Sequence, residues 1–320
     1  MSEPLLRVEH LTTRYAVRGG VFGAPGGTVR GAEDVSFTVG RGEIVGLVGE
    51  SGSGKSTVGR TIARLERATS GEVRFDGEDV LAFGPRALKR YRRRVQAVFQ
   101  DPASSLDPTM RVGEIIAEPL VVHGIGDRRD RRERVASLLA EVGLGPDAIR
   151  RYPRQFSGGQ RQRIGIARAL AVGPDLIIAD EPVSALDVSV QAQVINLLHA
   201  LRETAGLALL FISHDLPTVE YLCDRVVVMY LGRVMEIAPA ADFQRAPLHP
   251  YSRMLARDAP RFGGRLEARA EVGADATLAT GCVFRAQCPD AIPDCSRIPP
   301  ALEAVRPDRL VACIRKDLVS

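Results

Sequence analysis

The chain has 320 residues, 45% of them hydrophobic and 26% charged, and its formal net charge is +4 at pH 7. This composition is that of a soluble globular protein, and no apolar run approaches the roughly 20 residues of a membrane-spanning helix. The start, Met1 to Pro4, lacks the features of a secretory signal, so we expect a cytoplasmic protein. The length predicts two domains, or one large domain with an appendage.

The net positive charge does not favour a nucleic-acid partner. It comes almost entirely from arginines spread along the chain, since the only lysines are Lys55, Lys89 and Lys316. The densest basic cluster, residues 89–94, is more typical of a solvated helix face than of a nucleic-acid site. We therefore expect no nucleic-acid partner.

The first elements in chain order are short strands followed by a helix. Strand-like segments at residues 5–11 and 34–39 predict an antiparallel β-region. Residues 43–48 are apolar and rich in β-branched side chains, which predicts a buried strand, and residues 58–66 predict a helix.

A glycine-rich run joins the strand at 43–48 to that helix. Its glycines let backbone N–H groups point inward at one anion, and the helix start adds the positive end of its dipole. Lys55 would reach the β- and γ-phosphates, and the Ser56 hydroxyl would bind Mg²⁺. The run consists of Gly49, Glu50, Ser51, Gly52, Ser53, Gly54, Lys55, Ser56 and Thr57. It predicts a nucleoside triphosphate site, because an accidental glycine-rich turn would rarely lie between a strand and a helix.

The middle of the chain predicts a strand and then a helical region. Residues 95–99 form a strand-like segment, and residues 112–121 and 131–142 have helical spacing. The spacing predicts a helical region within about 101–157.

The amphipathic helix that follows begins with a second possible phosphate site. Its first residues are Ser157, Gly158, Gly159 and Gln160. We interpret Ser157 as the N-cap, and the two glycines leave backbone amides open to a phosphate. A second site of this kind makes sense if the surface closes on the nucleotide of another subunit.

Two carboxylates follow the apolar segment at 176–179. Asp180 and Glu181 would stand at the carboxyl end of a buried strand, where ligands of open α/β sheets bind. Asp180 would hold Mg²⁺, directly or through its water, and Glu181 would polarise the water that attacks the γ-phosphate. Alternatively, the two carboxylates only cap the next helix. The glycine-rich run at 49–57 makes this alternative less favoured.

Helix and strand alternate through the rest of the core. A helix at 188–202 and strands at 209–212 and 224–229 predict a parallel sheet flanked by helices. Past Met235 the pattern loosens. Cys223 is expected to be a buried apolar residue.

These motifs, in this order, resemble those of the ATP-binding subunit of an ABC transporter, and more narrowly of the oligopeptide/dipeptide importer branch. The resemblance covers about residues 5–260, and the run His249–Ser252 resembles a motif of the peptide-importer branch. It implies an α/β fold: a P-loop NTPase (ABC ATPase) core with an antiparallel β-subdomain, an inserted helical subdomain and a small cysteine-rich C-terminal tail. We expect residues 1–245 to form the nucleotide-binding domain and residues 246–320 the C-terminal extension.

The resemblance implies roles for four further residues. Gln100 resembles the glutamine that touches Mg²⁺ and reports to the membrane subunits. The run at 184–187, which ends in Asp187, resembles the loop that communicates across the dimer. His214 resembles the histidine that contacts the γ-phosphate. Tyr15 resembles the aromatic residue that stacks on adenine.

The resemblance also implies a mechanism, partners and a location. Two ATPase subunits, identical or homologous, would enclose ATP between residues 49–57 of one and 157–160 of the other. Closure and hydrolysis would drive alternating access in two transmembrane permease subunits. An extracytoplasmic substrate-binding protein would be an indirect partner. The chain would be peripheral at the cytoplasmic face of the cell membrane and would energise import of di- or oligopeptides. The alternatives are nickel, glutathione or glycans as cargo, a soluble ABC ATPase outside transport, or a regulatory module on an inactive ATPase.

Four of the five cysteines lie in the tail, at Cys282, Cys288, Cys295 and Cys313. A cytosolic chain disfavours structural disulfides, and four thiolates suit Zn²⁺ or an iron–sulfur cluster. Their spacing lacks the two-residue gaps of common zinc ribbons, and tails of the peptide-importer branch resemble iron–sulfur sites. We therefore favour a [4Fe–4S] cluster, with zinc or unligated thiols as alternatives.

Overall fold

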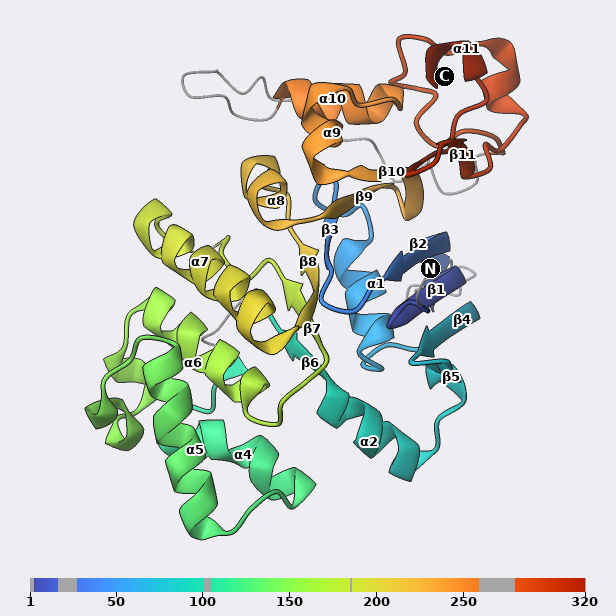
Figure 1. The fold of residues 1–320 in the computed structure, drawn as a ribbon. Helices are drawn as coiled ribbons and strands as arrows, with labels where there is room; N and C mark the ends of the chain where they lie inside the picture. The colour runs from blue at the N-terminus through green and yellow to red at the C-terminus, as the bar shows by residue number, and fades with distance from the viewer. Residues whose placement is uncertain (1–2, 17–27, 101–104, 185, 259–279, 320) are drawn as a thin grey trace, which may run out of the picture. The chain divides into compact units, whose positions relative to one another are not determined.

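The computed structural model describes residues 3–16, 28–100, 105–184, 186–258 and 280–319 (Figure 1). The chain divides into two compact units, each assembled from separate stretches of sequence. The first comprises Met1–Leu5, Val39–Ile44 and Asp76–Ile212, and the second comprises Leu6–Thr38, Val45–Phe75 and Ser213–Ser320. None of the helices in the described ranges is both long and apolar enough to span a bilayer.

The first unit combines a parallel sheet with a group of helices. Its elements are β5 (Glu78–Asp79), η1 (Val80–Ala82), α2 (Pro85–Arg94), β6 (Val95–Val98), α4 (Val112–His123), α5 (Arg128–Glu141), η2 (Pro146–Arg150), η3 (Pro153–Gln155), α6 (Gly158–Leu170), β7 (Leu176–Asp180), α7 (Val188–Ala205) and β8 (Ala208–Ile212). The strands β6, β7 and β8 pair in parallel in that order. Every residue of β7 and β8 is buried, which is typical of a parallel sheet covered on both faces.

The helices α4, α5 and α6 contact one another and lie together in Figure 1. The helix α4 runs two residues past the predicted end at Val121, because Gly124 ends it in the left-handed conformation with φ 66°. The helix α5 begins at Arg128, earlier than predicted, because Asp127 caps it by accepting hydrogen bonds from two backbone N–H groups of the first turn. Its apolar side chains Val135, Leu138 and Leu139 are buried.

The second unit holds the remaining strands. Its elements are β1 (Leu6–Ala16), β2 (Thr28–Val39), β3 (Ile44–Val48), α1 (Lys55–Ile62), β4 (Ser70–Phe75), α8 (Leu216–Leu222), β9 (Arg225–Tyr230), β10 (Arg233–Pro239), α9 (Ala240–Arg245), α10 (Pro250–Asp258), η5 (Pro293–Ser296), β11 (Glu303–Arg306), β12 (Arg309–Val311) and α11 (Lys316–Val319). The strand β1 lies between β2 and β4 and is antiparallel to β4, which confirms the predicted antiparallel β-region. The pair of β3 with β9 is parallel, whereas β9, β10, β12 and β11 pair antiparallel in that order.

Two sequence predictions in this unit were wrong. The first helix is Lys55–Ile62 and not 58–66: it begins directly after Gly54, and Arg64 takes a left-handed φ of 58° just beyond its end. Past Met235 the chain does not loosen, because β10 continues to Pro239 and two helices follow. Cys223 is buried at the end of α8, as expected.

Candidate functional site

The glycine-rich run at 49–57, here called the phosphate loop, directly follows β3, and its last three residues form the start of α1. Lys55 is the first residue of α1, and only 5% of its surface is exposed. Its Nζ donates hydrogen bonds to the carbonyl oxygens of Gly49 and Glu50, both at 2.8 Å. It also donates to Ser53 Oγ at 3.2 Å. The loop therefore wraps around the ammonium group and holds it at the start of the helix.

The start of α1 has the geometry of an anion site. Its N-cap is Gly54, which has a φ of 99° and makes no side-chain hydrogen bond to the first turn. A Cβ at that position would lie 2.1 Å from the Gly31 carbonyl oxygen, so only glycine fits. The positive end of the helix dipole and the Lys55 charge thus meet at the same place, which favours a bound phosphate.

Tyr15 and His214 also belong to the second unit. The Tyr15 hydroxyl donates to Thr57 Oγ1 at 3.3 Å, so its ring lies beside the last residue of the phosphate loop. The exposed His214 directly follows Ser213, whose N–H donates to the Leu47 carbonyl in β3 at 3.2 Å. His214 therefore lies close to the carboxyl end of the strand that leads into the loop.

Gln100, Asp180 and Glu181 lie in the first unit. Asp180 is the last residue of β7 and is 5% exposed, and Gln100 comes two residues after the neighbouring strand β6. The two side chains thus lie at or just beyond the carboxyl ends of adjacent parallel strands, where ligands of such sheets usually bind. Glu181 has a left-handed φ of 48°, and its N–H donates to the Ile212 carbonyl at 2.9 Å. A non-glycine residue in this conformation carries of order 1–3 kcal/mol of backbone strain, and residues strained in this way cluster at functional sites.

The run Ser157–Gln160, here called the signature run, opens α6, and Ser157 is its N-cap as predicted. The cap is reciprocal. Ser157 Oγ accepts from the Gln160 N–H at 3.3 Å, and Gln160 Oε1 accepts from the Ser157 N–H at 3.1 Å. A Cβ on Gly159 would lie 2.1 Å from Val190 Cγ1, so the start of α6 packs tightly on the first turn of α7. Only Gly159 of these four residues is buried, which leaves the rest of the run accessible.

Asp187 caps the other helix of this pair. Its carboxylate accepts from the Val190 N–H at 3.0 Å and from the Ser189 hydroxyl at 2.8 Å. The bond from the Val190 N–H and then that from the Ser189 hydroxyl lower the pKa of Asp187 below its usual value. The first residues of the predicted helical region, 101–104, lie outside the described residues.

The four tail cysteines line one small cavity of about 20 Å³, room for about one water-sized atom. Cys282 and Cys295 are joined through the backbone, since the Cys282 N–H donates to the Cys295 carbonyl at 2.8 Å. Burial raises the pKa of Cys282, Cys288 and Cys313, and the neighbouring thiols raise it further. None of the five cysteines, all within the described ranges, forms a disulfide.

A metal centre is supported by the donor set but not by its present geometry. Four thiols around one cavity are the ligands that an iron–sulfur cluster or zinc takes. Among the described residues, however, no group of three or more His, Cys, Asp or Glu side chains is arranged to hold a metal ion. The structure thus confirms that the four cysteines gather and does not support a particular metal.

One contact of the phosphate loop was not predicted from the sequence. The Glu50 N–H donates to the Tyr251 hydroxyl at 3.1 Å, although the two residues are 201 positions apart. The only local signal was the His249–Ser252 run, to which the sequence assigned no chemistry.

The comparisons with known proteins agree with this architecture. The family model described as ABC transporter matches residues 32–184, and the model described as oligopeptide/dipeptide transporter, C-terminal region, matches residues 235–295. A putative peptide import ATP-binding protein of Brucella ovis is 51% identical over 98% of this chain and 99% of its own length. The oligopeptide transport ATP-binding protein AppF of Bacillus subtilis is 46% identical over 97% of both chains.

Two solved structures share the fold. The dimeric structure of MJ0796, a bacterial ABC transporter cassette, is 30% identical with a TM-score of 0.66, over 73% of this chain and 98% of that one. The structure of cbiO1 from Clostridium perfringens, part of the ABC transporter complex cbiONQ, has a TM-score of 0.65 at 24% identity, over 77% and 92% of the two chains. At that identity the second likeness supports the fold alone. The sequence, the site geometry and these matches lead to one conclusion: the chain belongs to the ATP-hydrolysing subunits of ABC transporters, in the oligopeptide/dipeptide branch.

Proposed function

We propose that this chain binds and hydrolyses ATP to energise the uptake of di- or oligopeptides. The observation that carries the proposal is the pair of family matches, in which the oligopeptide/dipeptide region at 235–295 follows the ABC transporter region at 32–184. Import of nickel, glutathione or glycans, or work outside transport, has no comparable support.

The proposed partners are those of an importer. The chain would lie at the cytoplasmic face of the membrane as a peripheral subunit, bound to two transmembrane permease subunits. A second ATPase subunit, identical or homologous, would complete the nucleotide sites, and an extracytoplasmic substrate-binding protein would act indirectly.

Co-expression with the permease subunits tests this assignment. The permeases should co-purify with the chain, and a peptide-loaded binding protein should raise the ATPase rate of the reconstituted complex several-fold. The matched control is the same binding protein without peptide. Stimulation by nickel, glutathione or a glycan but by no peptide would overturn the peptide assignment, and failure to bind any permease would overturn transport.

Each site residue has a proposed role. Lys55 binds the β- and γ-phosphates, His214 contacts the γ-phosphate and Tyr15 stacks on adenine. Ser56, Gln100 and Asp180 hold Mg²⁺, which when bound neutralises charge on the phosphates. Glu181 accepts the proton of the attacking water. The remaining proposed nucleotide contacts are the other residues of the phosphate loop, the signature residues Ser157, Gly158, Gly159 and Gln160, and Asp187.

The signature residues act in trans in this proposal. What supports it is that Ser157 and Gln160 cap α6 on an accessible surface. Amides at that helix start would bind the γ-phosphate held by the other subunit. ATP would then bind the closed dimer better than the open one, and this difference in affinity drives the conformational change. We keep the division into residues 1–245 and 246–320, with a helical subdomain at about 101–157, as a proposal about domains.

We further propose that Cys282, Cys288, Cys295 and Cys313 hold a [4Fe–4S] cluster, in preference to Zn²⁺. All four line one cavity, where Cys282 and Cys295 are buried and Cys288 and Cys313 are partly buried, which supports a shared ligand. The preference for the cluster rests on the spacing of the cysteines, which lacks the two-residue gaps of common zinc ribbons. The role would be structural, because a cluster with four ligands would tie Cys313, which follows β12, to the segment from Cys282 to Cys295.

Anaerobic purification tests the metal centre. The parent chain should be coloured and contain about four iron atoms, and Cys295→Ala should lose both the iron and the visible absorption. Cys223→Ala is the matched control, because Cys223 is buried at the end of α8, outside the tail, and should keep both. Parent protein with neither iron nor visible absorption would eliminate the cluster, and stoichiometric zinc would replace it with the alternative.

A further inference from the structure

The peptide group between Gly49 and Glu50 is held at both ends. Its carbonyl oxygen accepts from Lys55 Nζ at 2.8 Å, and its N–H donates to the Tyr251 hydroxyl at 3.1 Å. Because a peptide group is planar and rigid, the two bonds together fix its orientation. Gly49 has a φ of 149°, and a Cβ there would lie 2.1 Å from the Met229 carbonyl, so this end of the loop has no side chain to hold it. The Tyr251 hydroxyl fixes it from outside the loop.

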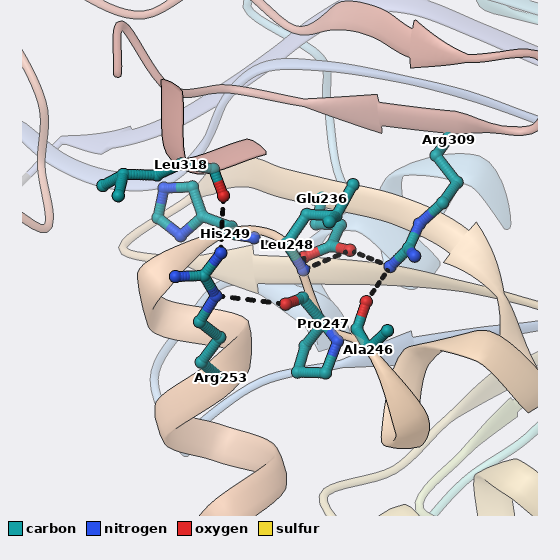
Figure 2. Close-up of polar contacts among 8 residues, drawn as sticks. All are labelled: Glu236, Ala246, Pro247, Leu248, His249, Arg253, Arg309 and Leu318. Atoms are coloured by element: carbon teal, nitrogen blue, oxygen red, sulfur yellow. Dashed lines mark hydrogen bonds and ion pairs between the residues drawn. The ribbon is translucent and has the colours of Figure 1, made fainter. Parts of the chain in front are cut away.

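Tyr251 is itself fixed by a buried polar network at the start of α10, which Figure 2 shows. The Glu236 carboxylate, fully buried on β10, accepts from the N–H groups of Leu248 at 3.1 Å and His249 at 2.8 Å. Arg309 of β12 donates to the same carboxylate at 2.7 Å. A buried carboxylate with this many donors is strongly anchored, so the turn that leads into α10 is anchored with it.

His249 extends that anchor to Tyr251. Burial lowers the pKa of His249 to about 3, so the imidazole is neutral at physiological pH. Its Nδ1 accepts from the Tyr251 N–H at 3.0 Å, which requires that this nitrogen carry no proton. The backbone of Tyr251 is therefore fixed at the first turn of the helix, where its side chain is fully buried.

The Tyr251 ring connects the phosphate loop to the cysteine region. It packs on Tyr230 with ring centroids 4.7 Å apart and on Phe284 with centroids 5.3 Å apart. Phe284 lines the cavity of the four cysteines and is 1% exposed. An unbroken line of contacts thus runs from that cavity through Phe284 and Tyr251 to the Gly49–Glu50 peptide.

We propose that Tyr251 is a positioning residue of the ATPase. Its hydroxyl holds the Gly49–Glu50 peptide so that the phosphate loop keeps Lys55 aimed at the nucleotide. Because Phe284 packs on Tyr251, the hydrogen bond between Tyr251 and the loop depends on correct folding around the four tail cysteines. The folding of that region thereby sets the affinity for ATP. The inference rests on the proposed phosphate-binding role of Lys55.

The test is the Tyr251→Phe variant of the full chain, which keeps the ring and removes the hydroxyl. Loss of one hydrogen bond should raise the Kd for MgATP, measured by displacement of a fluorescent ATP analogue, about 5–10-fold. The KM of the ATPase reaction should rise in parallel, while kcat at saturating ATP and the nucleotide-free melting temperature stay close to those of the parent. The matched control is Tyr221→Phe, which removes the hydroxyl of an exposed tyrosine on α8.

A second variant tests the connection to the cysteine region. Phe284→Leu should also weaken ATP binding, and adding it to Tyr251→Phe should weaken binding little further, because both changes act through one hydroxyl. Fully additive losses would show that Phe284 does not act through Tyr251 and would overturn that part of the proposal.

Lys55→Ala in the same assay separates this inference from the proposed function. If Lys55→Ala binds ATP normally, the assigned role of Lys55 fails. If Lys55→Ala loses ATP while Tyr251→Phe binds it as tightly as the parent, only the positioning role of Tyr251 is overturned. A fall in kcat or melting temperature with an unchanged Kd would indicate a merely structural tyrosine and would overturn it as well.

Discussion

The Glu181→Gln variant should bind ATP normally and hydrolyse it about 10²–10⁴-fold more slowly than the parent chain. The amide keeps the shape and hydrogen-bonding capacity of the carboxylate but cannot take the proton of the attacking water. Glu181 has a strained left-handed backbone conformation and directly follows the buried Asp180. The backbone therefore holds Glu181 in place whether or not its side chain is charged. Single-turnover hydrolysis and equilibrium ATP binding measure the two effects separately.

Glu203→Gln is the matched control for that change. Glu203 lies on α7 with a largely exposed side chain, and its contact with His199 is a surface pair at 3.9 Å. Such pairs contribute little to stability, so the control should hydrolyse ATP like the parent. Near-normal turnover in Glu181→Gln would remove Glu181 from its proposed role.

Replacing Lys55 with Ala should abolish ATP binding, or nearly so. The ammonium group is buried in the loop at the start of α1, and its proposed role is to bind the β- and γ-phosphates. Charge-assisted hydrogen bonds contribute about 1.5–3 kcal/mol each, so loss of contacts to two phosphates should weaken binding by about 10²-fold or more. Isothermal titration with MgATP measures the loss.

The chain offers a simple control for this second change, because it contains only two other lysines. Lys89 is exposed on α2, and Lys89→Ala should bind ATP like the parent. Equal affinity of the Lys55→Ala variant and the Lys89→Ala control would contradict the assignment of the phosphate loop.

The nucleotide-site residues could be predicted because each stands where one element changes into another. An apolar strand followed by glycines and Lys55, or by Asp180 and Glu181, is a local pattern whose chemistry follows from strand ends and helix starts. The Ser157 cap of α6 was likewise predictable, since a cap involves residues three positions apart. The roles of these residues stay predictions, because neither the structure nor the comparisons test them.

The bounds of α1 could not be predicted from apolar spacing alone. The helix begins at Lys55 because Gly54 can take a left-handed φ, and it ends early because Arg64 does too. Spacing favoured a helix that began at Val58, since the polar first turn carries no apolar signal. Backbone conformation, and not hydrophobic periodicity, determines both ends.

The C-terminal half was least predictable because its contacts are long-range. Glu236 and Arg309 are 73 residues apart, and nothing in the sequence around either residue indicates its partner. The bond from the Glu50 N–H to Tyr251 likewise depends on the whole course of β9, β10 and α10. No local pattern encodes such a contact, so the predicted loosening after Met235 was wrong.

The most direct test of the account is the mass of the Glu181→Gln protein in solution, measured by light scattering with and without saturating MgATP. The chain alone, or mixed with its companion ATPase subunit, should change from the 34.6-kDa species to one of about twice that mass when ATP is present, and return when ATP is removed. Protein that stays at the mass of one chain at saturating MgATP, both alone and with the companion, would contradict the claim that ATP holds two such subunits together.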